Sequence, residues 1–139
     1  MRGRRRSMRD IRPLALTLTR CAVGAIFLGV GVTHFGNHEV EVEDFRRWQL
    51  PLPDVAPYVV GSFEVVVGAL LLLGVRPRLA AALLACESIG IIATAGRIDG
   101  GSQLVLPPIL LVCCVLLAAL GGGLFQLGSR LSRPRRPAA

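Results

Sequence analysis

The sequence contains no lysine and few aromatic residues, and these scarcities narrow the classes of protein to which it can belong. All 16 basic residues are arginine, which we attribute to genome composition because alanine, glycine and valine are abundant as well. Only 18% of the 139 residues are charged while 53% are hydrophobic, so there are too few polar side chains to form a water-facing shell around a core. The composition therefore excludes an ordinary soluble domain and indicates an integral membrane protein.

The net charge of +7 does not indicate nucleic-acid binding, because the arginines are grouped around apolar segments. Twelve of them precede the first segment, separate the second from the third, or follow the last: Arg2, Arg4, Arg5, Arg6, Arg9, Arg12, Arg76, Arg78, Arg130, Arg133, Arg135 and Arg136. Cytoplasmic loops of membrane proteins are enriched in arginine. We therefore predict a multi-pass protein of the plasma (inner) membrane of a bacterium, with both termini cytoplasmic and no nucleic-acid partner.

Four apolar segments can be drawn in the sequence, at residues 14–35, 55–75, 79–95 and 104–127. Because roughly 20 helical residues cross a bilayer core about 30 Å thick, we predict an all-α, antiparallel four-helix transmembrane bundle over residues 14–127. Basic cytoplasmic tails are predicted at 1–13 and 128–139. In the first outer loop, Val42, Phe45 and Trp48 recur at helical spacing, which predicts a short interfacial helix. Pro77 is placed to begin the third spanning helix after a tight turn.

Three ionisable residues, Arg20, Glu64 and Glu87, lie inside these apolar segments. Each would cost at least about 2.5 kcal/mol in lipid unless it were paired or hydrated. Each also lies on a stripe of small residues, which predicts inward-facing surfaces made of Arg20, Gly24, Phe27 and Gly31, of Gly61, Glu64 and Gly68, and of Ala80, Leu83, Glu87, Gly90 and Thr94. We predict a buried cluster in which Arg20 pairs with Glu64. Three interpretations remain open: a proton-binding site, a static pair that fixes helix register, and an Arg20 that extends to the inner head groups.

Other candidate site residues lie near the outer ends of the predicted helices. His34, Trp48 and Tyr58 could contact the head group of a quinone, or could form the aromatic belt usual at a membrane surface. His34 and His38 have a spacing that suits a metal on one helical face, but a helix end is expected between them, so we predict no metal site. The four cysteines, Cys21, Cys86, Cys113 and Cys114, form no C-x-x-C pair and are predicted to be small packing residues.

Several motifs resemble those of the DoxX family of small four-helix membrane proteins. They are Arg20-Cys-Ala-Val-Gly24, His34-Phe35, Leu50-Pro-Leu-Pro53, and Gly61-Ser-Phe-Glu64-Val-Val-Val-Gly68 followed by the turn that holds Arg76 and Arg78. The resemblance covers roughly residues 20–120. It implies a bundle related to the DoxD-like subunit of thiosulfate:quinone oxidoreductase, working beside soluble redox partners. It places Arg20 and Glu64 at the family's recurring polar positions, whereas Glu87 is not part of the family pattern.

No set of side chains in the sequence amounts to a catalytic centre by itself. We therefore predict a membrane subunit or accessory of a redox complex, with the lipid bilayer as its environment. A quinone is the candidate cofactor and a soluble or membrane oxidoreductase the candidate partner, and a homo-oligomer remains open. Two alternatives also remain. One is a small proton-coupled transporter. The argument against it is that Arg20 on the first helix would repel cationic cargo. The other is a purely structural membrane protein.

Overall fold

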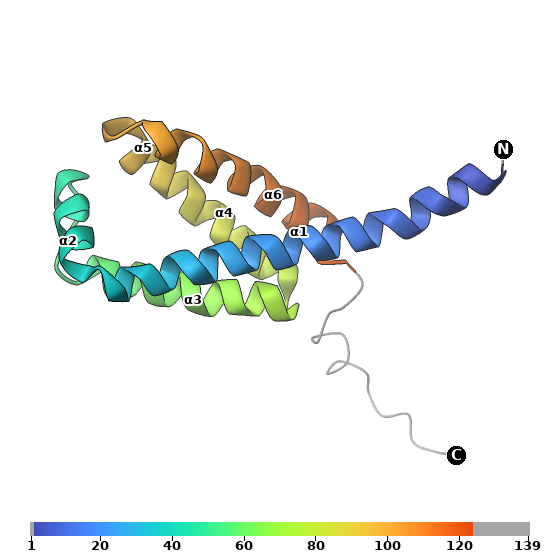
Figure 1. The fold of residues 1–139 in the computed structure, drawn as a ribbon, viewed down its shortest axis with the longest axis horizontal. Coiled ribbons are helices and arrows are strands. Elements are labelled where there is room, and N and C mark those ends of the chain that lie inside the picture. The colour runs from blue at the N-terminus through green and yellow to red at the C-terminus, as the bar shows by residue number, and fades with distance from the viewer. Residues whose placement is uncertain (1, 124–139) are drawn as a thin grey trace, which may run out of the picture.

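The computed structural model describes residues 2–123, and all regular elements in that part of the chain are helical (Figure 1). In chain order they are α1 (Arg2–Gly36), α2 (His38–Arg47), α3 (Ala56–Leu73), α4 (Pro77–Ala93), α5 (Ala95–Ile98), the 3-10 helix η1 (Gly101–Leu104) and α6 (Leu106–Leu120). Three stretches are long and apolar enough to cross a membrane, namely Ile11–Gly36, Ala56–Leu73 and Pro77–Ile98. Helix α6 is apolar but shorter. These helices suit a lipid bilayer.

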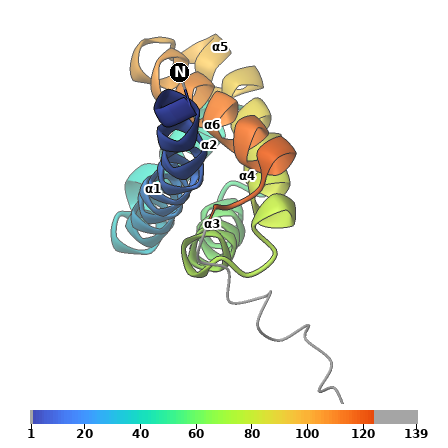
Figure 2. The same cartoon turned by 90° about the vertical axis from the view of Figure 1, so that its right-hand side faces the viewer.

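The long helices pack as two pairs, α1 with α3 and α4 with α6. Viewed along the long axis, α1 lies on one side and α4 and α6 on the other, with α3 below and between them (Figure 2). Helix α2 crosses the end of the molecule where α1 finishes and α3 begins, near α5 (Figure 1). The opposite end contains the turn between α3 and α4 and the last residues of α6. The loops predicted to face outward therefore gather at one end, and the arginine-flanked turn lies at the other.

Two helix boundaries differ from the sequence prediction. Helix α1 begins at Arg2 and runs through Pro13, where a basic tail was predicted up to residue 13. Arginine is a good helix former, so the helix continues beyond the apolar segment. Helix α6 ends at Leu120, because Gly121 adopts a left-handed φ of 92° that a helix cannot contain. The predicted span to 127 and the predicted tail at 128–139 extend outside the described residues.

The turn between α3 and α4 has the tight form that its sequence predicts. Gly74 caps α3 with a φ of 72°, a conformation that glycine adopts without steric cost. Arg76 is left-handed as well, with a φ of 45°. Pro77 then begins α4, where its fixed φ is compatible with the first helical turn. This turn holds α3 and α4 antiparallel with only three residues between them.

Helices α1 and α3 approach closely through glycines, as predicted from their small-residue stripes. A methyl group added at Gly31 would lie 2.8 Å from the carbonyl oxygen of Gly61, and one added at Gly24 would lie 2.9 Å from that of Gly68. Membrane helices gain van der Waals contact in this way, since lipid supplies little hydrophobic driving force between them. The matching spacing of seven residues on both helices fixes an antiparallel register in which Gly24 faces Gly68 and Gly31 faces Gly61.

The inward face predicted for the third spanning helix was wrong in part. Leu83 and Gly90 are exposed, and the buried face of α4 instead consists of Ala80, Ala81, Leu84, Ala85 and Ser88. Helix α4 packs mainly on α6, whose Leu110, Cys114 and Leu117 belong to the same buried cluster. The buried face of α4 therefore points toward α6. The small-residue stripe of α4 did not predict this partner.

Candidate functional site

The most deeply buried acidic side chain of the described residues is Glu64 on α3, which is 1% exposed. Its Oε2 lies 3.2 Å from Nε2 of His34, which is in the last turn of α1. His34 is also buried. The close approach of Gly31 and Gly61 makes this contact possible, because a methyl group added at Gly61 would lie 2.8 Å from Cβ of His34. The glycine pair therefore brings a carboxylate and an imidazole together inside the molecule.

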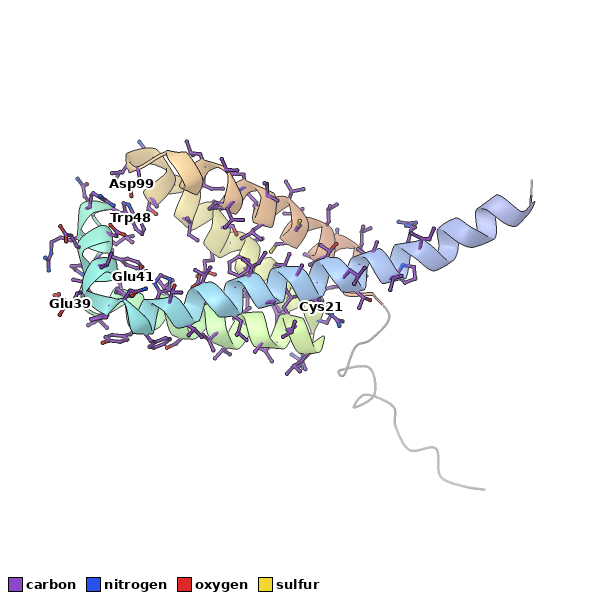
Figure 3. All side chains as sticks on the ribbon, in the orientation of Figure 1. Cys21, Glu39, Glu41, Trp48 and Asp99 are labelled. Atoms are coloured by element: carbon purple, nitrogen blue, oxygen red, sulfur yellow. The ribbon has the colours of Figure 1, made fainter. Side chains whose placement is uncertain are left out.

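The second nitrogen of His34 faces a different acid. Nδ1 of His34 lies 2.9 Å from Oε2 of Glu41, on the first turn of α2. Buried Phe45, one turn further along α2, packs edge-on against the imidazole with ring centroids 5.8 Å apart. Figure 3 shows Glu41 where α2 meets the end of the long helices. Both contacts are ion-pair contacts by distance, since Nδ1 of His34 and Oε2 of Glu64 have no hydrogen-bond partner of good geometry among the described residues. The imidazole therefore lies between one acid from α2 and one from α3.

An apolar cavity of about 210 Å³ adjoins the buried carboxylate. Helices α1, α3, α4 and α6 all contribute to its wall, through Ile26, Phe27, Val30, Glu64, Ser88, Ile91, Leu106, Pro107 and Leu110. Of the described residues in this wall, Glu64 alone is charged, and the hydroxyl of Ser88 already donates to Leu84 O at 2.9 Å. Small-molecule sites typically combine apolar walls with a few placed polar groups. The cavity has this composition.

Glu87 on α4 is electrostatically coupled to the same site. Its carboxylate interacts with Glu64 and with His34 through space. Its buried Oε2 has no hydrogen-bond partner among the described residues. Glu87 does not line the cavity. Two of the three residues predicted to form the buried cluster, Glu64 and Glu87, therefore lie in one electrostatic environment.

The structure does not confirm the predicted pair between Arg20 and Glu64. Arg20 is buried, and its Nη1 donates to the carbonyl oxygen of Gly122, 3.0 Å away, beyond the end of α6. In the antiparallel register, Arg20 lies one turn beyond the contact of Gly24 with Gly68, on the side away from Glu64. At 1.5 Å per residue this places the two residues about 12 Å apart along the helices. The carboxylate is instead paired with His34.

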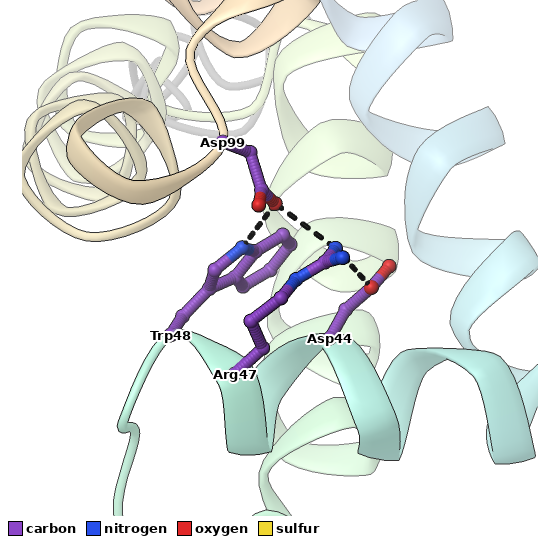
Figure 4. A network of polar contacts seen from close by, with 4 residues as sticks. All are labelled: Asp44, Arg47, Trp48 and Asp99. Atoms are coloured by element: carbon purple, nitrogen blue, oxygen red, sulfur yellow. Dashed lines mark hydrogen bonds and ion pairs between the residues drawn. The ribbon is translucent and has the colours of Figure 1, made fainter.

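The three residues predicted as head-group contacts do not gather around one cavity. His34 lies at the buried pair, whereas Tyr58 stacks on His38 with ring centroids 4.0 Å apart. Trp48 donates its indole N–H to Asp99 (Figure 4). None of the three lines the cavity beside Glu64. Their role as head-group contacts stays a prediction.

A polar network connects the C-terminal end of α2 to Asp99, which follows α5 (Figure 4). Arg47 lies in ion-pair contact with Asp44 on its own helix and, at 3.1 Å, with Asp99 after α5. The indole N–H of Trp48 donates to the same oxygen of Asp99. One carboxylate thus accepts from two residues at the end of α2. This network fixes the position of the helix that carries Glu41.

We expect Asp99→Ala to loosen α2 while leaving the fold intact. Exposed ion pairs contribute about 0–1 kcal/mol, so the loss should speed amide hydrogen exchange in α2 by about fivefold without unfolding the long helices. Exchange measured by mass spectrometry on the segment containing Trp48 tests this. Asp54→Ala is the matched control, since the side chain of Asp54 forms an exposed ion pair with Arg46 of α2 at 3.4 Å and does not join the Asp99 network. Equal exchange in both variants would show that Asp99 does not hold α2.

The remaining candidates for metal or thiol chemistry lie apart. Within residues 2–123, no group of three or more histidine, cysteine or acidic side chains is arranged to hold a metal ion. His34 and His38 face different neighbours, the first Glu41 and Glu64 and the second Tyr58. All four cysteines are free; Cys114 is fully buried in the α4–α6 packing, whereas Cys86 is exposed. The predicted packing role therefore fits Cys114 better than Cys86.

The sequence analysis did not predict that His34 and Glu41 would lie at the buried site with Glu64. His34 ends an apolar segment, and Glu41 follows seven residues later beyond a break at Asn37. A helix break allows the chain to fold back, so an acid can reach a histidine that one continuous helix would keep away. This combination of a histidine at a span end, a break and a nearby amphipathic acid is the signal that could have identified them.

Comparison with known proteins identifies the family. The family model described as DoxX matches residues 15–97, more than half of the chain, from α1 through α5. Helix α6 lies outside the match, although the motif resemblance extended to about residue 120. No curated protein and no solved structure matches the chain. With its three apolar helices of spanning length, the chain is a multi-pass membrane protein that belongs to the DoxX family.

Proposed function

We propose that the chain is a four-helix transmembrane subunit of a membrane redox complex, and that the cavity beside Glu64 receives the head group of a quinone. One observation carries the proposal. Among the described residues, Glu64 is the single charged residue of a largely apolar cavity wall, and behind that wall its carboxylate is paired with His34. Such a wall keeps one acid–base group in contact with whatever the cavity binds.

The chemistry of a quinone fits these side chains. Its carbonyl oxygens accept hydrogen bonds and take up protons on reduction, so a site for it needs a hydrogen-bond donor that can also exchange protons. Glu64 becomes such a donor when it takes the proton that it exchanges with His34, because its protonated carboxyl group can donate to a ligand oxygen in the cavity. The apolar residues around it would contact the ring. The side chains at the cavity carry protons and not electrons, so we assign electron delivery to an oxidoreductase partner.

The proposed orientation follows the arginines. The basic start of α1 and the turn with Arg76 and Arg78 would face the cytoplasm, and α2 would lie in the outer head-group region of the bacterial inner membrane. Helix α6 would complete the bundle as the fourth span. Its 15 residues extend about 22 Å, so the flanking residues must supply the rest of a crossing.

A proton-coupled transporter is the second candidate, and one observation favours it. The objection from sequence was that Arg20 would repel cationic cargo from the membrane carboxylate. With Arg20 about 12 Å from Glu64 along the helices, that repulsion is weaker than predicted. Proton release on addition of a lipophilic cation, abolished in Glu64→Gln, would support this candidate.

Quinone retention tests the first proposal. We expect the protein purified in mild detergent to retain quinone, and Glu64→Leu to retain about tenfold less, because leucine cannot donate to a quinone oxygen and a typical hydrogen bond is worth about 1 kcal/mol. Extraction followed by chromatography measures the retained quinone per protein.

Glu87→Leu is the matched control for that experiment. It makes the same carboxylate-to-alkyl change in the membrane-spanning part, but Glu87 does not line the cavity, so retention should stay close to that of the unaltered protein. Equal retention in all three proteins would contradict a quinone site at Glu64. If the unaltered protein neither retains quinone nor releases protons on addition of a lipophilic cation, the purely structural interpretation remains.

A further inference from the structure

Three titratable side chains from three helices form a line from the α2 end of the molecule to the cavity. Glu41 on α2 lies 2.9 Å from His34 on α1, and His34 lies 3.2 Å from Glu64 on α3. Exposure of these side chains falls along the line, from 18% for Glu41 to 10% for His34 and 2% for Glu64. The line therefore begins where water can reach it and ends in the interior.

Imidazole can pass protons along such a line because its two nitrogens act independently. Glu41 takes a proton from water and gives it to Nδ1 of His34. The proton already on Nε2 then leaves for the carboxylate of Glu64, so one proton enters and a different one departs. The ring finishes as the other tautomer, and in the forward direction one proton has moved from water to the buried carboxyl group. The same transfers in reverse carry the proton from Glu64 back to water and restore the first tautomer, so the path equilibrates Glu64 with water.

The opposite end of the molecule offers no comparable route in the part that the structure describes. Beyond Glu64 in that direction the interior is filled by Phe27, Val67 and Leu71 with Leu84 and Leu117. The contact between Gly24 and Gly68 closes the α1–α3 interface at backbone level. No acid or histidine of the described helices lies between these residues and buried Arg20.

We propose that Glu41, His34 and Glu64 form a proton path that connects the cavity to the α2 end of the protein. The groups that face this path are Glu41 from α2, Glu64 from α3 and Glu87 from α4, with His34 itself on α1. The path adds a proton route to the proposed function. It depends on that proposal only for the identity of the ligand in the cavity. It assigns the protons exchanged there to the side on which α2 lies. Under the orientation proposed above, this is the outer side of the membrane.

A pH jump followed by infrared spectroscopy tests the path directly. The carboxyl C=O band of Glu64 is first located in the vesicle-reconstituted protein as the band that disappears in Glu64→Gln. A light-released proton then shifts the pH across the titration of that band, and the rate of its appearance is recorded. We expect Glu41→Gln to slow this rate by about a hundredfold, as expected for loss of a positioned proton carrier. Glu43→Gln, an exposed acid of the same helix, should leave the rate unchanged.

Several results would overturn the path. Equal rates in Glu41→Gln and the unaltered protein would show that protons reach Glu64 another way. The absence of any titrating Glu64 band would show that this carboxyl group does not exchange protons. If Glu41→Gln loses the helical amide band, His34→Gln decides in its place, because glutamine can still donate to Glu64 but cannot relay a proton. The carboxyl band reports on Glu64 whether or not quinone or a partner is bound, so failure here is distinct from failure of quinone retention.

Discussion

Gly31→Ala is expected to lower the free energy of unfolding by about 2 kcal/mol, even though alanine is the better helix former. The added methyl group would lie 2.8 Å from both Gly61 O and Cβ of Glu64, closer than real contacts permit. Overpacking of this kind typically costs about 1–3 kcal/mol, because neighbouring atoms must move. Here one of the two nearest atoms is a backbone oxygen of α3 and the other is a Cβ that moves only with that backbone, so α1 and α3 must separate. Unfolding in mixed micelles with a denaturing detergent measures the change.

Gly29→Ala provides the matched control for that prediction. Gly29 is on the same helix, and an added methyl group would meet nothing within 4 Å. Since alanine is favoured over glycine in a helix by about 1 kcal/mol, this variant should be unchanged or slightly more stable. If Gly29→Ala and Gly31→Ala were equally destabilising, the cost would lie in the helix itself and not in the contact between α1 and α3.

The helices and the α1–α3 interface could be predicted from sequence for one physical reason. Long apolar segments set the helices, and glycines at a spacing of seven residues on both partners set the face by which two of them meet. Gly24 and Gly31 on α1 match Gly61 and Gly68 on α3. The information was therefore local to each helix and complementary between them.

The α4 face and the partner of Glu64 could not be predicted in this way. The orientation of α4 depends on α6, which carries no small-residue stripe that specifies where it packs. The partner of Glu64 depends on antiparallel register. Midplane distances estimated from span ends suggested that Arg20 could reach the carboxylate, whereas the register brings His34 to it and leaves Arg20 near Gly122. An error of one helical turn is enough to exchange one partner for the other.

His34→Leu is expected to be among the most destabilising single changes in the membrane-spanning part, at about 3–5 kcal/mol. It would remove the cation or donor that faces Glu64, leaving a carboxylate that is 1% exposed beside an apolar cavity. An uncompensated buried charge costs this much even though the intact pair adds little net stability. His38→Leu is the control, because His38 stacks on Tyr58 and should cost about 1 kcal/mol. Detergent unfolding of both variants measures the difference.

The double variant His34→Leu with Glu64→Leu separates this explanation from a loss of packing. Removing both members leaves no charge to bury, so the double variant should be more stable than His34→Leu alone, and the two single losses should not add. A double variant that loses the sum of both singles would mean that the residues act independently, and that the 3.2 Å contact contributes no coupling. Since the proton path requires this contact, the cycle also tests whether the link between α1 and α3 on which the path depends is energetically real.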